Sequence, residues 1–204
     1  MIAKRCFDVF ASTTGLVVLF PVLLAIGAAI YLSGSGPVLF RQERVGLRGA
    51  LFKIHKFRTM RVEASHDAPL LTIGADPRIT SIGAVLRRYK LDELPQLFDV
   101  LIGKMSIVGP RPEVPRYVAL YSPTEREVVL SVRPGITDRA SIRFRNENEV
   151  LGSASDPERE YIEYVLPEKC RLYVEYVRTR TFWLDLQIIA ETLFGPLRDR
   201  TRLS

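Results

Sequence analysis

The chain has 204 residues and a formal net charge of +6. This length is enough for a folded domain with a membrane anchor, and the positive charge favours anionic partners such as nucleic acid, acidic lipids or phosphorylated substrates. The two cysteines lie at opposite ends, which excludes a disulfide framework and a cysteine zinc motif, and the presence of only two histidines argues against a histidine-based metal site.

A long apolar segment follows the N-terminus. No charged residue lies between Asp8 and Arg41, and residues 9–32 consist largely of Val, Leu, Ile, Ala, Phe and Gly. About twenty such residues are the usual requirement for a membrane helix. A signal peptide is disfavoured because the segment is long and no small-residue cleavage site follows it closely. The sequence therefore predicts a membrane-embedded domain over residues 1–35, with a buried core helix as the alternative.

Pro21 lies near the middle of this segment. It removes a backbone donor and clashes with the preceding turn, so we expect a break in the helix there. Positive residues favour the cytoplasmic side, and they flank both ends of the segment: Lys4, Arg5, Arg41, Arg44 and Arg48. A re-entrant helix-break-helix keeps both clusters on that side, since each limb of about twelve residues, roughly 18 Å, is too short to cross a bilayer. A kinked single span is the open alternative.

Residues 36–204 are predicted to form a small cytosolic domain that is mainly helical. Extended segments at 38–40 and 51–57 flank a turn at 46–49, which indicates a short β-hairpin, and residues 64–75 read as a loop. Helices are predicted from Asp76 and Pro77, from Asp92 to Gly103, and over residues 123–130, 157–177 with an interruption at Pro167, and 183–194. The fold class is therefore α+β, mainly helical, with the re-entrant membrane helix packed against this domain.

Two adjacent carboxylates, Asp92 and Glu93, stand at a predicted helix start. Capping of free N–H groups is the structural explanation for a carboxylate at that place. The functional explanation is that the same environment lowers the carboxylate pKa and gathers phosphate oxygens. An ionised Asp can then attack phosphorus, and a neighbouring Glu can help to hold Mg²⁺, which favours one or two carboxylates with substrate phosphates.

Basic residues cluster on both sides of the acidic pair in the sequence. Arginine forks match phosphate oxygens, although many of these side chains are also expected to be solvated or to contact lipid headgroups. Arg111 stands out because Pro110 and Pro112 restrict where it points. The whole set is Lys53, Lys56, Arg58, Arg61, Arg87, Arg88, Lys90, Arg111, Arg133, Arg139, Arg143 and Arg145.

Seven segments, in order, resemble the bacterial sugar transferase family, the small monotopic phosphoglycosyl transferases. They are GPVLFRQ (36–42), RVG (44–46), FKIHKFRTM (52–60), LDELPQL (91–97), MSIVGPRP (105–112), RPGIT (133–137) and FWLD (182–185). Each segment alone is a weak signal, but together they are specific and extend over nearly the whole chain. Larger members carry further N-terminal membrane helices, so we expect this chain to correspond to the minimal catalytic unit.

The resemblance implies transfer of sugar-1-phosphate from a nucleotide diphosphate sugar, usually UDP-linked, to polyprenyl phosphate such as undecaprenyl phosphate, with release of UMP. It implies Asp92 as the nucleophile of a covalent phosphosugar intermediate, Glu93 as a Mg²⁺ ligand and Pro21 as the membrane break. Substrate and phosphate contacts are expected from Lys56, Arg58, Arg87, Arg111 and Arg145. The implied location is the bacterial inner membrane, with the catalytic domain on the cytoplasmic face, in a first membrane step of exopolysaccharide or lipopolysaccharide biosynthesis.

The chain departs from the family pattern after residue 137. Many members continue GWAQVNGRN, whereas residues 138–146 here read DRASIRFRN, so Arg145 keeps its match while the sugar and nucleotide contacts differ. Phe20 replaces the serine that often precedes the membrane proline. The alternative function is a non-catalytic, membrane-tethered binder of anionic lipid or polysaccharide precursors. Nucleic acid is not expected as a partner because no recognition motif is visible, and a homodimer stays open.

Overall fold

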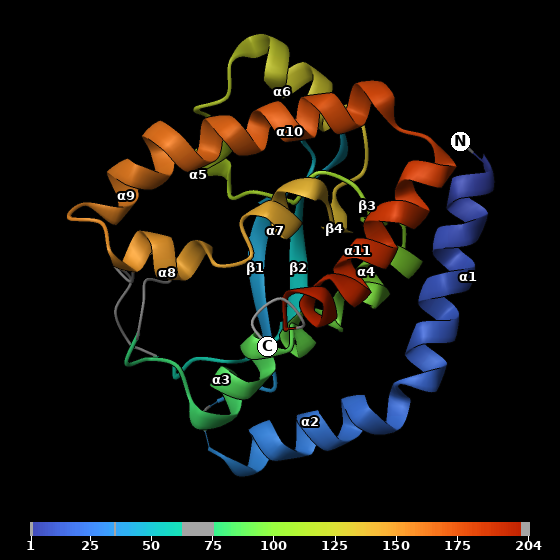
Figure 1. The fold of residues 1–204 in the computed structure, drawn as a ribbon. Helices are drawn as coiled ribbons and strands as arrows, with labels where there is room; N and C mark the ends of the chain where they lie inside the picture. The colour runs from blue at the N-terminus through green and yellow to red at the C-terminus, as the bar shows by residue number, and fades with distance from the viewer. Residues whose placement is uncertain (1, 35, 63–75, 201–204) are drawn as a thin grey trace.

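The computed structural model describes residues 2–34, 36–62 and 76–200, so the predicted loop at 64–75 lies outside the described residues. An antiparallel hairpin, β1 (Leu39–Val45) and β2 (Leu51–Phe57), stands at the centre, with helices around it (Figure 1). A short parallel pair, β3 (Ser106–Val108) and β4 (Gly135–Thr137), lies beside it. The predicted mainly helical fold with a hairpin is therefore confirmed.

Two N-terminal helices border the domain. Helices α1 (Ile2–Val18) and α2 (Phe20–Leu32) follow one side and the lower edge of the molecule (Figure 1). They are bent by 61° at a break at Leu19, and Pro21 lies in the first turn of α2. Pro21 has no N–H, and this costs nothing in a first turn, where the N–H would be unpaired. The break thus lies where the proline predicts it.

Polar contacts join the first half of α1 to the rest of the chain. The Lys4 ammonium lies 2.6 Å from the Asp185 carboxylate. Arg5 donates to the carbonyls of Val100 and Leu101 at 2.8 and 3.0 Å. Buried Asp8 accepts from the Ser106 hydroxyl and the Ile107 N–H. The start of the apolar segment is therefore attached to the domain by specific hydrogen bonds and one ion pair.

The remaining helices cover the hairpin. They are α3 (Ser81–Arg88), α4 (Gln96–Leu101), α5 (Pro115–Val118), α6 (Pro123–Leu130), α7 (Arg139–Arg143), α8 (Glu147–Gly152), α9 (Pro157–Glu160), α10 (Leu166–Thr179) and α11 (Phe182–Arg200). The largest core cluster lies under α10, where buried Tyr117, Tyr161 and Tyr173 pack with Val45 of β1. A second cluster joins β2 to the end of α4 through Ile54, Val100 and Met105.

Three helix boundaries differ from the predicted ones. The Asp76 carboxylate turns back onto Arg78 at 2.6 Å, so the helix begins at Ser81 with Thr80 as its cap. A three-residue 3-10 turn, Leu91–Glu93, precedes α4, which starts only at Gln96. The interruption expected at Pro167 takes the form of a π-helical segment, Tyr161–Val165, just before α10. This wider turn relieves the clash between the proline ring and the preceding carbonyls.

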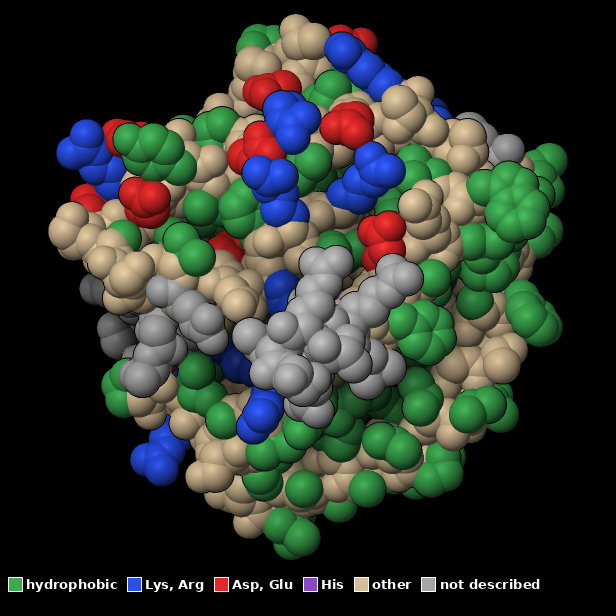
Figure 2. Space-filling model, viewed as in Figure 1, with side chains coloured by type: hydrophobic (Ala, Val, Ile, Leu, Met, Phe, Trp, Pro, Cys, Tyr) green, Lys and Arg blue, Asp and Glu red, His purple; other side chains and the backbone are tan. Residues whose placement is uncertain are grey.

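Many apolar side chains of α1 and α2 are exposed. Figure 2, in the same view as Figure 1, shows hydrophobic side chains along the edges formed by these helices, whereas acidic and basic side chains gather on the opposite side near α10. Phe10, Val17, Val18, Leu24 and Leu32 are each more than half exposed. Within the described residues, no single helix has the length and apolar composition to cross a membrane, and the bent pair α1 and α2 passes that test only together.

Candidate active site

The acidic pair lies in a tight reversal between two helices. Helix α3 ends at Arg88, and Lys90 then adopts a left-handed conformation with φ of 58°. This conformation is costly for a residue with a side chain, so the reversal is strained. The 3-10 turn Leu91–Glu93 follows at once and leads into α4. The reversal directs both carboxylates toward the interior, where Asp92 is 8% exposed.

Glu93 forms ion pairs with two cations from distant parts of the chain. The ammonium of Lys56, on β2, lies 2.9 Å from Glu93 Oε1. Arg111 donates from both terminal nitrogens, with Nη1 3.2 Å from Oε2 and Nη2 bonded to Oε1. Burial alone would raise the pKa of Glu93, but Arg111 and Lys56 outweigh it and hold that pKa well below its usual range. Glu93 is therefore an ionised carboxylate throughout the neutral range.

Asp92 has a different environment from its neighbour. Its Oδ1 atom is buried and accepts no hydrogen bond from any described residue. Burial, followed by the charge of Glu93, raises the pKa of Asp92 above its ordinary value. The expected lowering of this pKa is therefore wrong. A 3-10 turn of three residues without a side-chain cap offers too few aligned N–H groups to stabilise the charge.

Arg111 is positioned by a close approach of two backbone segments. Gly109 and Gly135 touch so closely that a Cβ on Gly135 would lie 2.1 Å from the Gly109 nitrogen. The Gly135 N–H donates to the Pro110 carbonyl at 2.9 Å, and the Gly109 N–H donates to Thr137. These bonds attach the Pro-Arg-Pro segment to β4. Glu93 in turn raises the Arg111 pKa well above its ordinary value, so the guanidinium is a permanent charge.

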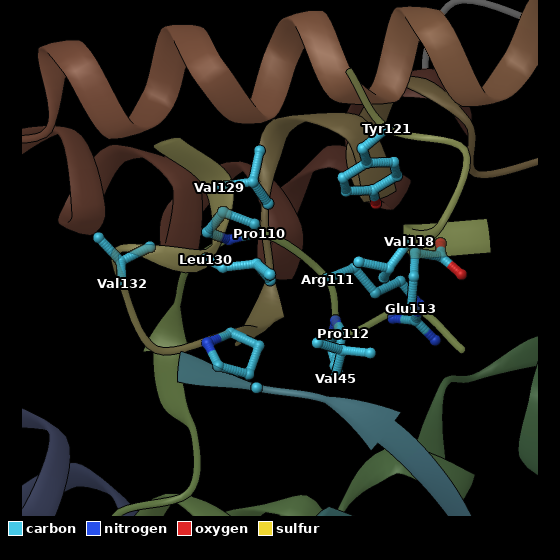
Figure 3. A pocket seen from close by; sticks show the side chains of 12 residues that line it. Val45, Pro110, Arg111, Pro112, Glu113, Val118, Tyr121, Val129, Leu130 and Val132 are labelled. Carbon is cyan, nitrogen blue, oxygen red and sulfur yellow. The ribbon is translucent and has the colours of Figure 1, made fainter. Parts of the chain in front are cut away.

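A small pocket lies behind the Pro-Arg-Pro segment. Figure 3 shows Arg111 and Glu113 beside it. The other side chains that line the pocket are mostly apolar and come from β1, α6 and nearby segments. Its lining includes Val45, Val118 and Val129 but neither Asp92 nor Glu93. This pocket is part of the support for Arg111, and the two carboxylates lie outside it.

The other predicted phosphate ligands fall into two groups. Arg87, on α3, donates from Nε to the Thr59 hydroxyl at 2.9 Å. Burial lowers the Arg87 pKa while the charge of Asp92 opposes this effect, so the two groups interact. Arg58 instead donates to the Pro37 carbonyl and lies over the Phe40 ring. The Arg145 guanidinium lies against Gly195 of α11. The structure thus gathers Lys56, Arg87 and Arg111 around the acidic pair, and it gives Arg58 and Arg145 contacts elsewhere.

Two polar pairs near this site, each with a buried carboxylate, were not predicted from the sequence. His55, one residue before Lys56, pairs with Asp99 at 2.8 Å. Arg44 lies 3.6 Å from buried Glu113, which also accepts from the Tyr161 hydroxyl. Each pair joins residues more than 40 positions apart. Only the basic and acidic residue types themselves were visible in the sequence, and no spacing rule connects them.

The residues present fit a magnesium ion bound mainly through substrate. In the part of the chain that is described, no group of three or more His, Cys, Asp and Glu side chains could hold a metal by itself. Mg²⁺ often uses one or two carboxylates together with substrate phosphates. The unpartnered Asp92 Oδ1 has the chemistry of such a ligand, and Glu93 would have it too if one of its two cations moved to the substrate phosphates.

Comparison with known proteins agrees with the motifs. A family model described as bacterial sugar transferase matches residues 1–199. The chain is 39% identical over 197 residues to UDP-glucose:undecaprenyl-phosphate glucose-1-phosphate transferase of Klebsiella pneumoniae, with 95% of this chain and 40% of that protein covered. It is 42% identical over 200 residues to undecaprenyl-phosphate glucose phosphotransferase of Komagataeibacter xylinus, with 95% and 35% covered.

A third relative carries a different sugar in its name. UDP-N-acetylgalactosamine-undecaprenyl-phosphate N-acetylgalactosaminephosphotransferase of Aeromonas hydrophila is 34% identical over 199 residues, with 93% of this chain and 42% of that protein covered. The chain thus spans about two fifths of the length of these relatives. Because the family model extends over almost all of the sequence, the chain belongs to the bacterial sugar transferase family.

Proposed function

We propose that this chain transfers sugar-1-phosphate from a UDP-sugar to undecaprenyl phosphate and releases UMP. The observation that carries the proposal is the acidic pair, in which Glu93 is paired with Lys56 and Arg111 while Asp92 Oδ1 lies buried without a partner. Two adjacent carboxylates with opposite pKa shifts suit two separate roles. The names of the relatives, which combine a UDP-sugar with undecaprenyl phosphate, support the substrate classes.

In the first step, an oxygen of ionised Asp92 attacks the sugar-linked phosphorus of the donor. The bond from that phosphorus to the bridging oxygen breaks, and the electron pair leaves with UMP. Asp92 then carries the sugar-1-phosphate as an acyl phosphate. A raised pKa makes the carboxylate a better nucleophile once it is ionised, and an acyl phosphate is a reactive intermediate.

In the second step, a phosphate oxygen of the lipid acceptor attacks the same phosphorus. The acyl phosphate bond breaks and returns the Asp92 carboxylate, and the lipid carries a new diphosphate. Lys56, Arg87 and Arg111 face the region of negative charge in both steps, and fixed cations stabilise charge that spreads over phosphoryl oxygens. When bound, Mg²⁺ would supply further neutralisation of the donor diphosphate, with Glu93 as its protein ligand.

The covalent route explains how one site serves two substrates. The donor is soluble and the acceptor is a lipid, so sequential use of Asp92 avoids binding both at once. We propose that residues 1–35 form a re-entrant anchor in the bacterial inner membrane, with residues 36–204 on its cytoplasmic face. Support comes from the 61° bend and from the exposed apolar side chains of α1 and α2. The acceptor phosphate would then lie at headgroup level, close to the acidic pair.

A donor screen tests the proposed activity. The protein is purified with membrane lipid and incubated with Mg²⁺, undecaprenyl phosphate and either UDP-glucose or UDP-N-acetylgalactosamine, and released UMP is measured. At least one donor should give UMP, and Asp92→Asn should lower the rate by more than about a thousandfold because the nucleophile is lost. Asp76→Asn, in a carboxylate paired with Arg78, is the matched control and should keep most of the rate. Binding of donor without release of UMP would indicate the non-catalytic binder instead.

A further inference from the structure

A buried carboxylate on α4 binds β2, the strand that carries Lys56. Asp99, on α4, is 0% exposed. Its Oδ2 atom accepts the backbone N–H of His55 at 2.9 Å, and its Oδ1 atom lies 2.8 Å from His55 Nδ1. A carboxylate can only accept, so Nδ1 carries the proton of this bond. Both oxygens of one buried side chain are thus used on a single residue of β2.

The bond from the His55 N–H to Asp99 satisfies a donor at the edge of the hairpin. A two-stranded hairpin is only marginally stable alone, and the outer edge of each strand presents unpaired N–H groups. Asp99 supplies an acceptor to such a group from outside the sheet. A buried carboxylate is costly unless its oxygens are bonded, and an apolar side chain of similar size would pack without that cost. The carboxylate therefore specifies where α4 lies relative to β2 rather than simply filling space.

The same two segments carry the acidic pair and its lysine. Lys56 directly follows His55 on β2, and Glu93 ends the 3-10 turn that precedes α4. The Lys56 ammonium meets Glu93 at 2.9 Å. The Phe98 ring adds an edge-on contact to the His55 ring, with centroids 5.8 Å apart. Any shift of β2 along α4 would move the Lys56 ammonium away from Glu93 by a similar distance.

We propose that Asp99 and His55 are positioning residues, which hold the Lys56 ammonium against Glu93 and against the phosphoryl group under transfer. This inference rests on the proposed function, because it assigns the pair a role in the rate of that reaction. Asp99 acts through His55 and Lys56 and does not itself touch the substrate. A displacement of about 1 Å in a catalytic group can slow a reaction by about a hundredfold. Fixing β2 in place therefore helps to maintain the rate of transfer.

The test compares two substitutions of Asp99 with a matched buried carboxylate. Asp99→Leu removes both acceptors, and Asp99→Asn keeps one oxygen for the His55 N–H. Asp185→Leu serves as the control, since Asp185 is also buried and bound to a side chain of another element but lies at the contact between α1 and α11. For each variant of the 204-residue chain in lipid, kcat and donor KM are measured through UMP release, and the melting temperature is measured separately. A purely structural role would not separate kcat from stability.

Asp99→Leu is expected to lower kcat by about 10- to 100-fold with donor KM changed by less than about threefold. Asp99→Asn should recover most of the loss, and Asp185→Leu should lower the melting temperature while keeping kcat per folded molecule. Folded Asp99→Leu with wild-type kcat would overturn the proposal, as would an equal loss in Asp185→Leu. If Asp99→Leu does not fold, His55→Phe decides, because it removes the ring bond to Asp99 and wild-type kcat in that variant contradicts the role. A wild-type protein that releases no UMP instead refutes the proposed function.

Discussion

At the scale of single residues, Asp92 and Glu93 are neighbours in sequence with opposite electrostatics. The sequence predicted that the pair is important but assigned both carboxylates to one helix-start environment. The structure separates them, because Lys56 and Arg111 come from distant segments and both bind Glu93. No local spacing rule could show which of the two carboxylates receives the cations. The sequence also could not show that burial raises the pKa of Asp92.

The lowered pKa of Glu93 leads to a stability prediction. Glu93→Gln should reduce the free energy of unfolding by roughly 3 kcal/mol at neutral pH, because two buried cations lose their partner. The folded-state pKa is below the unfolded one, so this stabilisation is present above about pH 4.3 and is lost as the pH falls through the folded-state pKa. Denaturant unfolding of both proteins at several pH values measures the difference.

The matched control for this prediction is Glu168→Gln, since Glu168 pairs with Arg171 at 2.7 Å on the exposed face of α10. Exposed pairs contribute little to stability, so this variant should unfold like the wild type. A loss in Glu93→Gln that is equally large in strong acid would contradict the assignment, because the protonated carboxyl group would then be as stabilising as the ionised one.

At the scale of elements, the helix caps connect sequence to site. Ser122 and Glu125 form a capping box at α6, and that helix was predicted with the bounds found in the structure. The predicted start at Asp76 was wrong because its carboxylate is used by Arg78 rather than by helix N–H groups. The real cap is Thr80, whose hydroxyl accepts from the Gly83 N–H. A Thr within an apolar stretch is a weaker signal than Asp followed by Pro.

Thr80→Ala should lower the free energy of unfolding by about 1 kcal/mol, the usual cost of a lost cap. It should also slow UMP release, because α3 carries Arg87 and fraying of its first turn loosens that arginine. Ser122→Ala removes the comparable cap of α6, away from the acidic pair, and should reduce stability by a similar amount with turnover unchanged. Turnover that falls equally in both variants would show that α3 has no special link to the site.

At the scale of the whole molecule, an apolar edge and a polar domain meet along α1. The hydropathy of residues 9–32 predicted the apolar edge and Pro21 predicted its break. The sequence did not reveal that Lys4 attaches α1 to α11, that Arg5 attaches it to α4 and that Asp8 attaches it to β3. These contacts depend on residues about 100 or more positions away. Two of these contacts join α1 to α4, which follows the acidic pair, and to β3, which precedes Arg111.

Cysteine labelling tests the re-entrant arrangement. Ile2→Cys and Ser33→Cys are made separately in a Cys6→Ser background, since Cys6 is exposed and Cys170 is buried. Both cysteines should resist a membrane-impermeant maleimide in intact cells and react after permeabilisation, because a re-entrant anchor keeps both ends of the bent pair on the cytoplasmic side. Labelling of only one of them in intact cells would indicate a spanning helix and would contradict the proposed anchor.

The central claim is that Asp92 forms a covalent bond to the sugar-phosphate, and intact-mass measurement tests it most directly. The protein in lipid is incubated with Mg²⁺ and the UDP-sugar that gives UMP, without lipid acceptor. The account predicts a mass increase of one sugar phosphate together with UMP in equal amount, the adduct mapped to Asp92, and its disappearance when undecaprenyl phosphate is added. Turnover of both substrates with no adduct under these conditions, or an adduct that persists in Asp92→Asn, would contradict it.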